Sequence, residues 1–166
     1  MSAPVVAYVG LGGNVGDAER TLPAAIEALA AIPQTRCLRA SRLYRTAAWG
    51  REDQPAFVNA VAQLQTVLDA RALLAALLDI ERAFGRHRAA DGSDRWGPRT
   101  LDLDLLLFGA QTIDEPGLQV PHPHLHERAF VLVPLLEIAP ELVVPGRGLA
   151  RAALTAMATD GVQAIG

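Results

Sequence analysis

The sequence predicts an α+β fold in which helices cover one face of an antiparallel sheet. Segments typical of strands and helices follow one another in the order strand, helix, strand, strand, helix, strand, which is the order of a layered α+β domain. Hydrophobic residues make up 51% and charged residues 20% of the 166 residues, a composition that supports a sizeable core. We therefore expect residues 1–166 to form a single domain.

The first half of the chain supplies three strands and one helix. Residues 5–11 form an apolar run that ends in a glycine-rich turn, and residues 18–32 repeat apolar side chains at helical spacing. The repeated positions are Leu22, Ile26 and Leu29. Residues 37–44 and 57–64 are typical of two further strands that flank an irregular segment.

The second half supplies a long helix over residues 69–84 and a strand over residues 101–108. The segment between them, 85–100, is polar, contains glycine and is rich in arginine, so we expect a loop. Helices over residues 128–136 and 149–158 complete the chain. The pattern predicts a ferredoxin-like antiparallel sheet with helices packed on one face, plus a C-terminal helical extension.

Composition excludes several classes of function. The net charge of −3 argues against a general binder of nucleic acid or membrane surfaces. All fifteen basic residues are arginine, so no lysine can serve a P-loop, a protein-kinase strand or a Schiff base. Cys37 is the only cysteine, which excludes an intrachain disulfide and a zinc site built from cysteines. Since no secretory signal or membrane-spanning run is evident, we expect a cytoplasmic protein with small-molecule partners, and a monomer.

An Asp-x-Asp pair stands in the predicted strand 101–108. Successive side chains of a strand point to opposite faces, so Asp102 and Asp104 share one face while the neighbouring leucines share the other. Two carboxylates roughly 7 Å apart along a strand offer oxygen ligands to Mg²⁺, which keeps further positions for water and phosphate oxygens. The pair is also compatible with two solvated aspartates on an open sheet face, so its neighbours decide between the two interpretations.

The loop before this strand concentrates positive charge. Five of the fifteen arginines lie within eighteen residues: Arg82, Arg86, Arg88, Arg95 and Arg99. Guanidinium groups bind phosphate oxygens through paired hydrogen bonds and stay protonated at working pH. Carboxylates for a metal beside arginines for phosphate are the groups that polyphosphate transfer requires. A solvated basic surface is the alternative, but it explains Arg95 and Arg99 poorly because they flank Trp96 and lead into the aspartates.

Together these motifs resemble those of the 6-hydroxymethyl-7,8-dihydropterin pyrophosphokinase family along nearly the whole chain. The most specific segment is RWGPRTLDLD, residues 95–104. Weaker segments match in the same order and spacing: Gly12-Gly13-Asn14, SRLYRT at 41–46, Asp53-Gln54-Pro55 with Phe57 and Asn59, Gly85-Arg86-His87-Arg88, Val120-Pro121-His122 and Glu127-Arg128-Ala129-Phe130.

The resemblance implies an enzyme of folate biosynthesis that moves a pyrophosphoryl group from ATP to the hydroxymethyl oxygen of the pterin and releases AMP. It implies two Mg²⁺ ions held by Asp102 and Asp104, and it implies that Arg86 and Arg99 stabilise the migrating charge. The further nucleotide contacts that it implies are Arg88, Arg95, Trp96, Leu105, His122 and Arg128.

The resemblance also implies a slot for the pterin ring. A flat heterocycle favours stacking against aromatic rings together with a few polar partners. Phe57 and Phe130 would supply the rings, although either is by itself compatible with ordinary core. The amide of Asn59 can both donate and accept hydrogen bonds at the ring edge. The substrate contacts implied are Gly12, Thr46, Trp49, Phe57, Asn59 and Phe130.

Two other functions stay open on the residues alone. One is a different Mg²⁺-dependent phosphoryl or nucleotidyl transferase with the same aspartate pair, and the other is a non-catalytic module that binds a ligand through its sheet. The glycines near residue 12 lack the spacing of a dinucleotide fingerprint. We expect His124 and His126 to be exposed loop residues and His122 alone to contact nucleotide. Glu81 is expected to be a surface charge or a support for the arginine loop.

Overall fold

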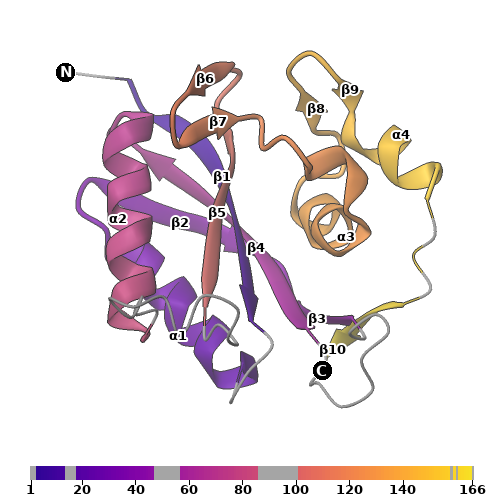
Figure 1. Cartoon of the computed structure of the whole chain (residues 1–166), viewed down its shortest axis with the longest axis horizontal. Helices are drawn as coiled ribbons and strands as arrows, with labels where there is room; N and C mark the ends of the chain where they lie inside the picture. Colours follow the sequence, from indigo (N-terminus) through magenta and orange to yellow (C-terminus); the bar gives the residue numbers. More distant parts are fainter. Residues whose placement is uncertain are drawn as a thin grey trace.

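The computed structural model of the chain describes residues 3–13, 18–46, 57–85, 101–157, 159 and 161–165. Within these ranges the main sheet has six strands: β1 (Val5–Gly13), β2 (Thr35–Ala40), β3 (Leu43–Thr46), β4 (Phe57–Thr66), β5 (Asp102–Phe108) and β10 (Val162–Ile165). Their order is β10-β3-β4-β1-β5, β2 also pairs with β4, and all pairs are antiparallel. The predicted ferredoxin-like arrangement is confirmed (Figure 1).

Two helices, α1 (Ala18–Ala30) and α2 (Ala70–Ala83), cover the first face of this sheet (Figure 1). The Asp69 carboxylate caps α2 by accepting a 2.8 Å hydrogen bond from the backbone N–H of Ala72. Each helix buries an apolar stripe at helical spacing. The buried leucines are Leu22 and Leu29 on α1 and Leu73 and Leu77 on α2. They pack on the inward side chains of β1, β4 and β5 in one core.

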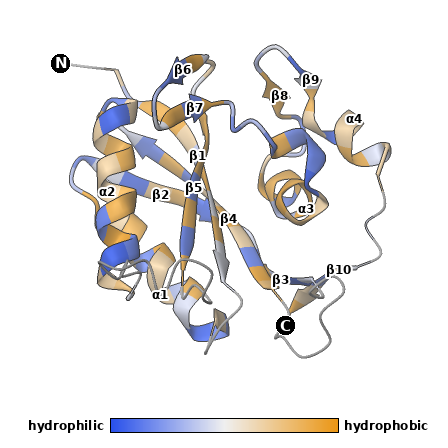
Figure 2. Ribbon diagram, in the orientation of Figure 1, coloured by the Kyte–Doolittle hydropathy of each residue, from blue (hydrophilic) through white to orange (hydrophobic). Residues whose placement is uncertain are grey.

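A third helix, α3 (Ala129–Ile138), lies on the opposite side of the sheet, which we call the second face (Figure 1). It is apolar on most of its surface (Figure 2), as expected of a helix that is buried on several sides. It packs on Tyr8, Val61, Leu106 and Leu107 in a second core. The predicted C-terminal extension therefore forms a second layer rather than an appendage.

Shorter elements surround α3. They are the hairpin of β6 (Ile113–Glu115) and β7 (Leu118–Val120), the 3-10 helix η1 (Leu125–Glu127), the hairpin of β8 (Val143–Val144) and β9 (Gly148–Leu149), and α4 (Ala150–Thr155). Neither hairpin was predicted, although a Pro-Gly pair that is typical of turns stands between the two strands of each, at Pro116-Gly117 and Pro145-Gly146. In the described part of the chain, each helix is too short or too polar to cross a membrane.

Two predicted elements were wrong in extent. The strand expected over residues 37–44 is divided into β2 and β3 at Ser41. The Ser41 side chain accepts a 2.9 Å hydrogen bond from the N–H of Val61 on β4, so a hydroxyl replaces a backbone carbonyl and the chain turns. The terminal helix expected over residues 149–158 ends at Thr155, and the chain then forms β10, which pairs with β3.

Strand β5 contains a bulge that matters for the site. Tyr8 pairs with Leu107 and Val9 pairs with Leu105, so Leu106 is an extra residue without a partner in the β1 register. Before the bulge the side chains of β5 alternate between the two faces, and after it the alternation is shifted by one residue. As a result Leu106 and Leu107 both belong to the core under α3.

Candidate active site

The polar residues predicted for the site lie at the end of the second face beyond the core under α3. In antiparallel strands, residues that are directly opposite each other point to the same face. Asp104 pairs with Gly10, Asp102 pairs with Gly12, and Gly12 pairs in turn with Asn59. Further along, Tyr44 pairs with Asn59 and Thr46 pairs with Phe57. The register therefore brings together the following predicted residues: Gly12, Thr46, Phe57, Asn59, Asp102 and Asp104.

The two aspartates point away from the α1 and α2 core. Leu103 and Leu105 are buried in that core, whereas Asp104 is exposed and Asp102 is half-buried. The predicted cofacial geometry is thus confirmed. Across the described residues, no cluster of three or more histidine, cysteine or acidic side chains could hold a metal ion. A pair of carboxylates on an open strand fits Mg²⁺, which often takes one or two carboxylates and completes its shell with water and substrate phosphate.

Glu81 supports this strand from behind. It lies in the last turn of α2 and is only 3% exposed, so the expectation of a surface charge was wrong. Its Oε2 accepts a 2.7 Å hydrogen bond from the backbone N–H of Leu103, the residue between the two aspartates. Strand β5 is the edge strand of the sheet, and a carboxylate here takes the place of a neighbouring strand.

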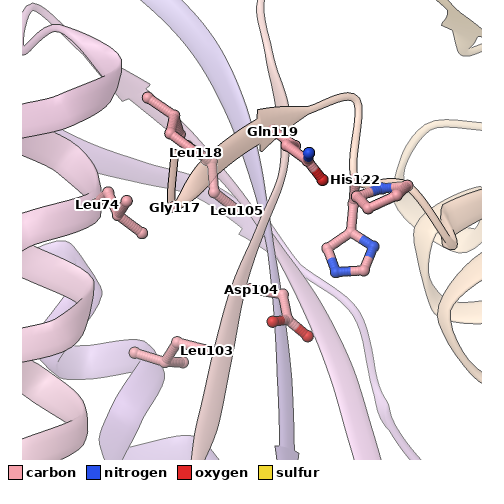
Figure 3. Close-up of a pocket in the computed structure, with 9 residues that line it drawn as sticks. Leu74, Leu103, Asp104, Leu105, Gly117, Leu118, Gln119 and His122 are labelled. Atoms are coloured by element: carbon pink, nitrogen blue, oxygen red, sulfur yellow. The ribbon is translucent and has the colours of Figure 1, made fainter. Parts of the chain in front are cut away.

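An open cleft of about 420 Å³ runs along the edge of β5. Its apolar wall consists of Leu74, Leu103, Leu105 and Leu118. Its polar end consists of Asp104, Gln119 and His122. In Figure 3, Asp104 and His122 lie on one side of β5, and Leu74 and Leu103 lie on the other. The cleft therefore runs from an apolar region to the Asp104 carboxylate, one of the two predicted metal ligands.

The hydrogen bonds of His122 define which of its ring nitrogens carries the proton. Nδ1 accepts a 3.1 Å hydrogen bond from the backbone N–H of His124, so Nδ1 is unprotonated and Nε2 carries the proton. Burial lowers the pKa of His122, and the positive charge of Arg128 acts in the same direction while Asp104 opposes both. A neutral imidazole with Nε2–H beside Asp104 is a hydrogen-bond donor for phosphate oxygens.

The two predicted aromatic residues differ in exposure. Phe57, at the start of β4, is 41% exposed, which excludes the alternative that it is ordinary core. Phe130, in the first turn of α3, is half-buried against the second core. The Arg128 guanidinium carbon lies 5.8 Å from the centre of the Phe130 ring, within cation–π range. Arg128 and Phe130 are therefore presented together at the N-terminus of α3.

Asn59 and Thr46 carry polar atoms without partners. Considering the described residues only, Asn59 Oδ1 and Thr46 Oγ1 are buried and form no hydrogen bond. Buried polar atoms are nearly always satisfied, so such atoms point to a missing ligand or water. A Cβ atom built on Gly12 would lie 2.7 Å from Asn59 Nδ2. Glycine at this position therefore leaves the space that the Asn59 amide occupies.

Six predicted site residues lie outside the described residues: Trp49, Arg86, Arg88, Arg95, Trp96 and Arg99. Other residues of the site were not singled out from the sequence, among them Leu74, Leu118 and Gln119 of the cleft. Leu74 lies within the predicted helix 69–84 and has no feature that separates it from the other apolar residues of that helix. Leu118 and Gln119 directly precede the segment Val120-Pro121-His122, and their nearness to this matching segment is the only signal that could have pointed to them.

Taken together, the fold and the site define an enzyme-like centre in which a carboxylate pair lies between an open cleft and the unpartnered buried oxygens of Asn59 and Thr46. The chain belongs to the 7,8-dihydro-6-hydroxymethylpterin-pyrophosphokinase family, because the family model matches residues 8–140. The match includes both aspartates, Asn59 and Phe130.

Individual relatives agree with this membership. The chain is 46% identical over 160 residues to the 2-amino-4-hydroxy-6-hydroxymethyldihydropteridine pyrophosphokinase of Methylorubrum extorquens, covering 96% of this chain and 98% of the relative. It is 50% identical over 143 residues to the enzyme of the same name from Pseudomonas aeruginosa, covering 86% of each.

Solved structures agree on the fold. The Plasmodium falciparum HPPK-DHPS wild-type structure matches with a TM-score of 0.73 at 13% identity. The match covers 94% of this chain but only 45% of that longer chain. At this level of identity the likeness supports the fold alone.

Proposed function

We propose that this chain uses ATP to pyrophosphorylate 6-hydroxymethyl-7,8-dihydropterin in folate biosynthesis, with Mg²⁺ bound by Asp102 and Asp104 and AMP as the second product. Membership of the family carries the acceptor and the transferred group. The position of the aspartate pair, between the cleft and the unpartnered Asn59 Oδ1 on β4, is the observation that supports the remaining assignments.

The cleft suits ATP. Its leucine wall offers an apolar surface to the adenine, and its polar end offers Asp104 and His122 to the phosphates. Mg²⁺ bound at the aspartates would neutralise phosphate charge and polarise the transferred group. His122 Nε2–H and the Arg128 guanidinium would donate hydrogen bonds to phosphate oxygens. By resemblance, Arg86 and Arg99 would stabilise the migrating charge.

The other side of the aspartate pair suits the pterin. Strands lie roughly 4.8 Å apart, so β4 is about 10 Å from β5 across β1. This separation allows the hydroxymethyl group of a pterin on β4 to reach phosphates held at β5. Asn59 and Thr46 would hydrogen-bond to the ring, and Phe57 and Phe130 would contact its faces.

The proposed reaction is an in-line displacement. The hydroxymethyl oxygen attacks the β-phosphorus of ATP, the bond between that phosphorus and the oxygen bridging to the α-phosphorus breaks, and the hydroxyl proton is released. Gly12, which lies between Asp102 and Asn59 in the strand register, adds no side chain between the two substrates. AMP leaves with both electrons of the broken bond.

The direct test is to incubate the protein with ATP, Mg²⁺ and 6-hydroxymethyl-7,8-dihydropterin and to separate the nucleotides. AMP is expected, and ADP would overturn the reaction class. Asp104→Asn and Asp102→Asn should each lower turnover on the order of a thousandfold, because loss of a metal ligand costs several kcal/mol of transition-state stabilisation. Asp79→Asn is the matched control, since Asp79 is an exposed aspartate on α2 that pairs with Arg82.

A further inference from the structure

Glu137, in the last turn of α3, joins this helix to the strands that carry the pterin contacts. Its two carboxylate oxygens accept hydrogen bonds of 3.2 and 3.1 Å from the backbone N–H of Arg42. The same carboxylate accepts a hydrogen bond from the hydroxyl of Tyr44. Both donors belong to the short segment that enters β3 after the turn at Ser41.

This contact is more than a surface ion pair. The Arg42 and Glu137 side chains are separated by 3.4 Å and are 58% and 27% exposed, so their charge attraction alone contributes little. The other two donors differ in this respect. The Tyr44 side chain is only 4% exposed, and the backbone N–H of Arg42 lies where the chain leaves the ladder with β4. The carboxylate therefore accepts hydrogen bonds from two donors, the Arg42 N–H and the Tyr44 hydroxyl, that are costly to leave without an acceptor at this position.

The contact lies between the two sides of the proposed pterin slot. Tyr44 is directly opposite Asn59, and two residues further along β3 Thr46 is opposite Phe57. Glu137 is seven residues after Phe130 on α3, so the two lie on nearly the same side of the helix, two turns apart. One carboxylate thus fixes the helix that carries Phe130 relative to the strands that carry Asn59.

We propose that Glu137 is a positioning residue that sets the width of the pterin slot through Tyr44 and the backbone of Arg42. The inference rests on the proposed function, because it assigns the slot to the pterin. A small rotation of α3 would move Phe130 relative to β4, while the leucine wall and Asp104 of the cleft, which lie on other elements, would stay in place. Arg128 at the start of α3 is the one proposed ATP contact that would move with the helix. The expected effect is therefore larger for the pterin than for ATP.

The test compares steady-state kinetics for both substrates in wild type, Glu137→Gln, Glu137→Ala and Tyr44→Phe. Loss of the hydrogen bond from Tyr44 should raise the KM for the pterin about tenfold in Tyr44→Phe. Glu137→Ala also removes the acceptor of the Arg42 N–H, so it should raise this KM at least as much. The KM for ATP should rise much less in both variants. Glu137→Gln keeps one oxygen acceptor, so it should rescue most of the loss. If Glu137→Ala does not fold, the two isosteric variants still decide the question.

The matched control is Ile138→Val, which removes one methylene from the adjacent buried residue of α3 and leaves the carboxylate in place. If the KM for ATP rises by the same factor as the KM for the pterin, and if Ile138→Val shows the same rise in KM for a given fall in Tm, Glu137 is only structural and the proposal is wrong. Unchanged KM values in all variants would equally overturn it. Wild type that forms no AMP would instead overturn the proposed function, and the positioning role would fall with it.

Discussion

Gly12→Ala is the substitution for which the structure gives the sharpest expectation. Neither Gly10 nor Gly12 has a positive φ, so the backbone of β1 accepts alanine at both positions. At Gly12, however, the new Cβ would lie 2.7 Å from Asn59 Nδ2. This is well inside a normal contact of about 3.5–4.0 Å, so the amide must move by on the order of 1 Å.

The displacement should change ligand affinity more than stability. The Asn59 side chain can rotate, and replacing glycine in a strand reduces the freedom of the unfolded chain by about 0.5–1 kcal/mol. Because hydrogen bonds weaken steeply with such a shift, the donor and acceptor of Asn59 would together lose about 2–3 kcal/mol of pterin binding. This corresponds to a pterin Kd that rises on the order of 30- to 150-fold.

Calorimetric titration of the pterin in the presence of Mg²⁺ and a non-hydrolysable ATP analogue measures this Kd. Gly10→Ala is the control, because its Cβ would lie 3.5 Å from Leu106, an ordinary contact. In an Asn59→Ala background, Gly12→Ala should have almost no further effect, since its steric partner is absent. An unchanged Kd in Gly12→Ala, or equal losses in Gly10→Ala, would refute the reasoning.

Three further outcomes are expected from other parts of the structure. Glu81→Ala leaves the Leu103 N–H without its acceptor and should lower Tm by roughly 3–10 °C. Glu81→Gln should lower Tm less, and an unchanged Tm in Glu81→Ala would exclude the supporting role of Glu81. Leu74→Glu places a negative charge in the proposed ATP cleft and should raise the KM for ATP about tenfold, whereas Leu78→Glu, on the exposed side of the same helix, should not. Burial raises the pKa of Tyr44 above its ordinary value near 10, so its neutral form contributes stability that is present below that pH and is lost as pH rises through the folded pKa. Ultraviolet titration should show this late ionisation in wild type and lose it in Tyr44→Phe.

The sequence was sufficient where one local rule determined the structure. Alternation along a strand placed Asp102 and Asp104 on one face, and helical spacing identified both helices of the first face. The break at Ser41 could not be predicted in this way, because it depends on a side-chain hydroxyl bonding to Val61 twenty residues away. The segment therefore has the sequence pattern of one continuous strand, although its regular pairing with β4 is interrupted between β2 and β3.

Longer-range effects account for the other differences. The residues of α3 are apolar on most sides, so periodicity alone could not assign the helix to a particular face. The sequence of α2 alone suggests that Glu81 is a surface charge. Its burial depends on a hydrogen bond to the edge of β5, which no pattern within the helix can reveal. The burial of Glu81 and the close approach of the Asn59 amide to Gly12 both depend on pairs of residues that are distant in sequence.

The bulge in β5 links the packing of the second face to its chemistry. With strict alternation, Leu107 would join Leu103 and Leu105 in the core under α1 and α2, and the residue after it would turn toward α3. The extra residue instead places Leu106 and Leu107 together under α3. The carbonyl of Leu106 also accepts a 2.9 Å hydrogen bond from the backbone N–H of His122. One inserted residue thus closes the apolar half of the second face and holds the imidazole beside Asp104, where the polar half begins.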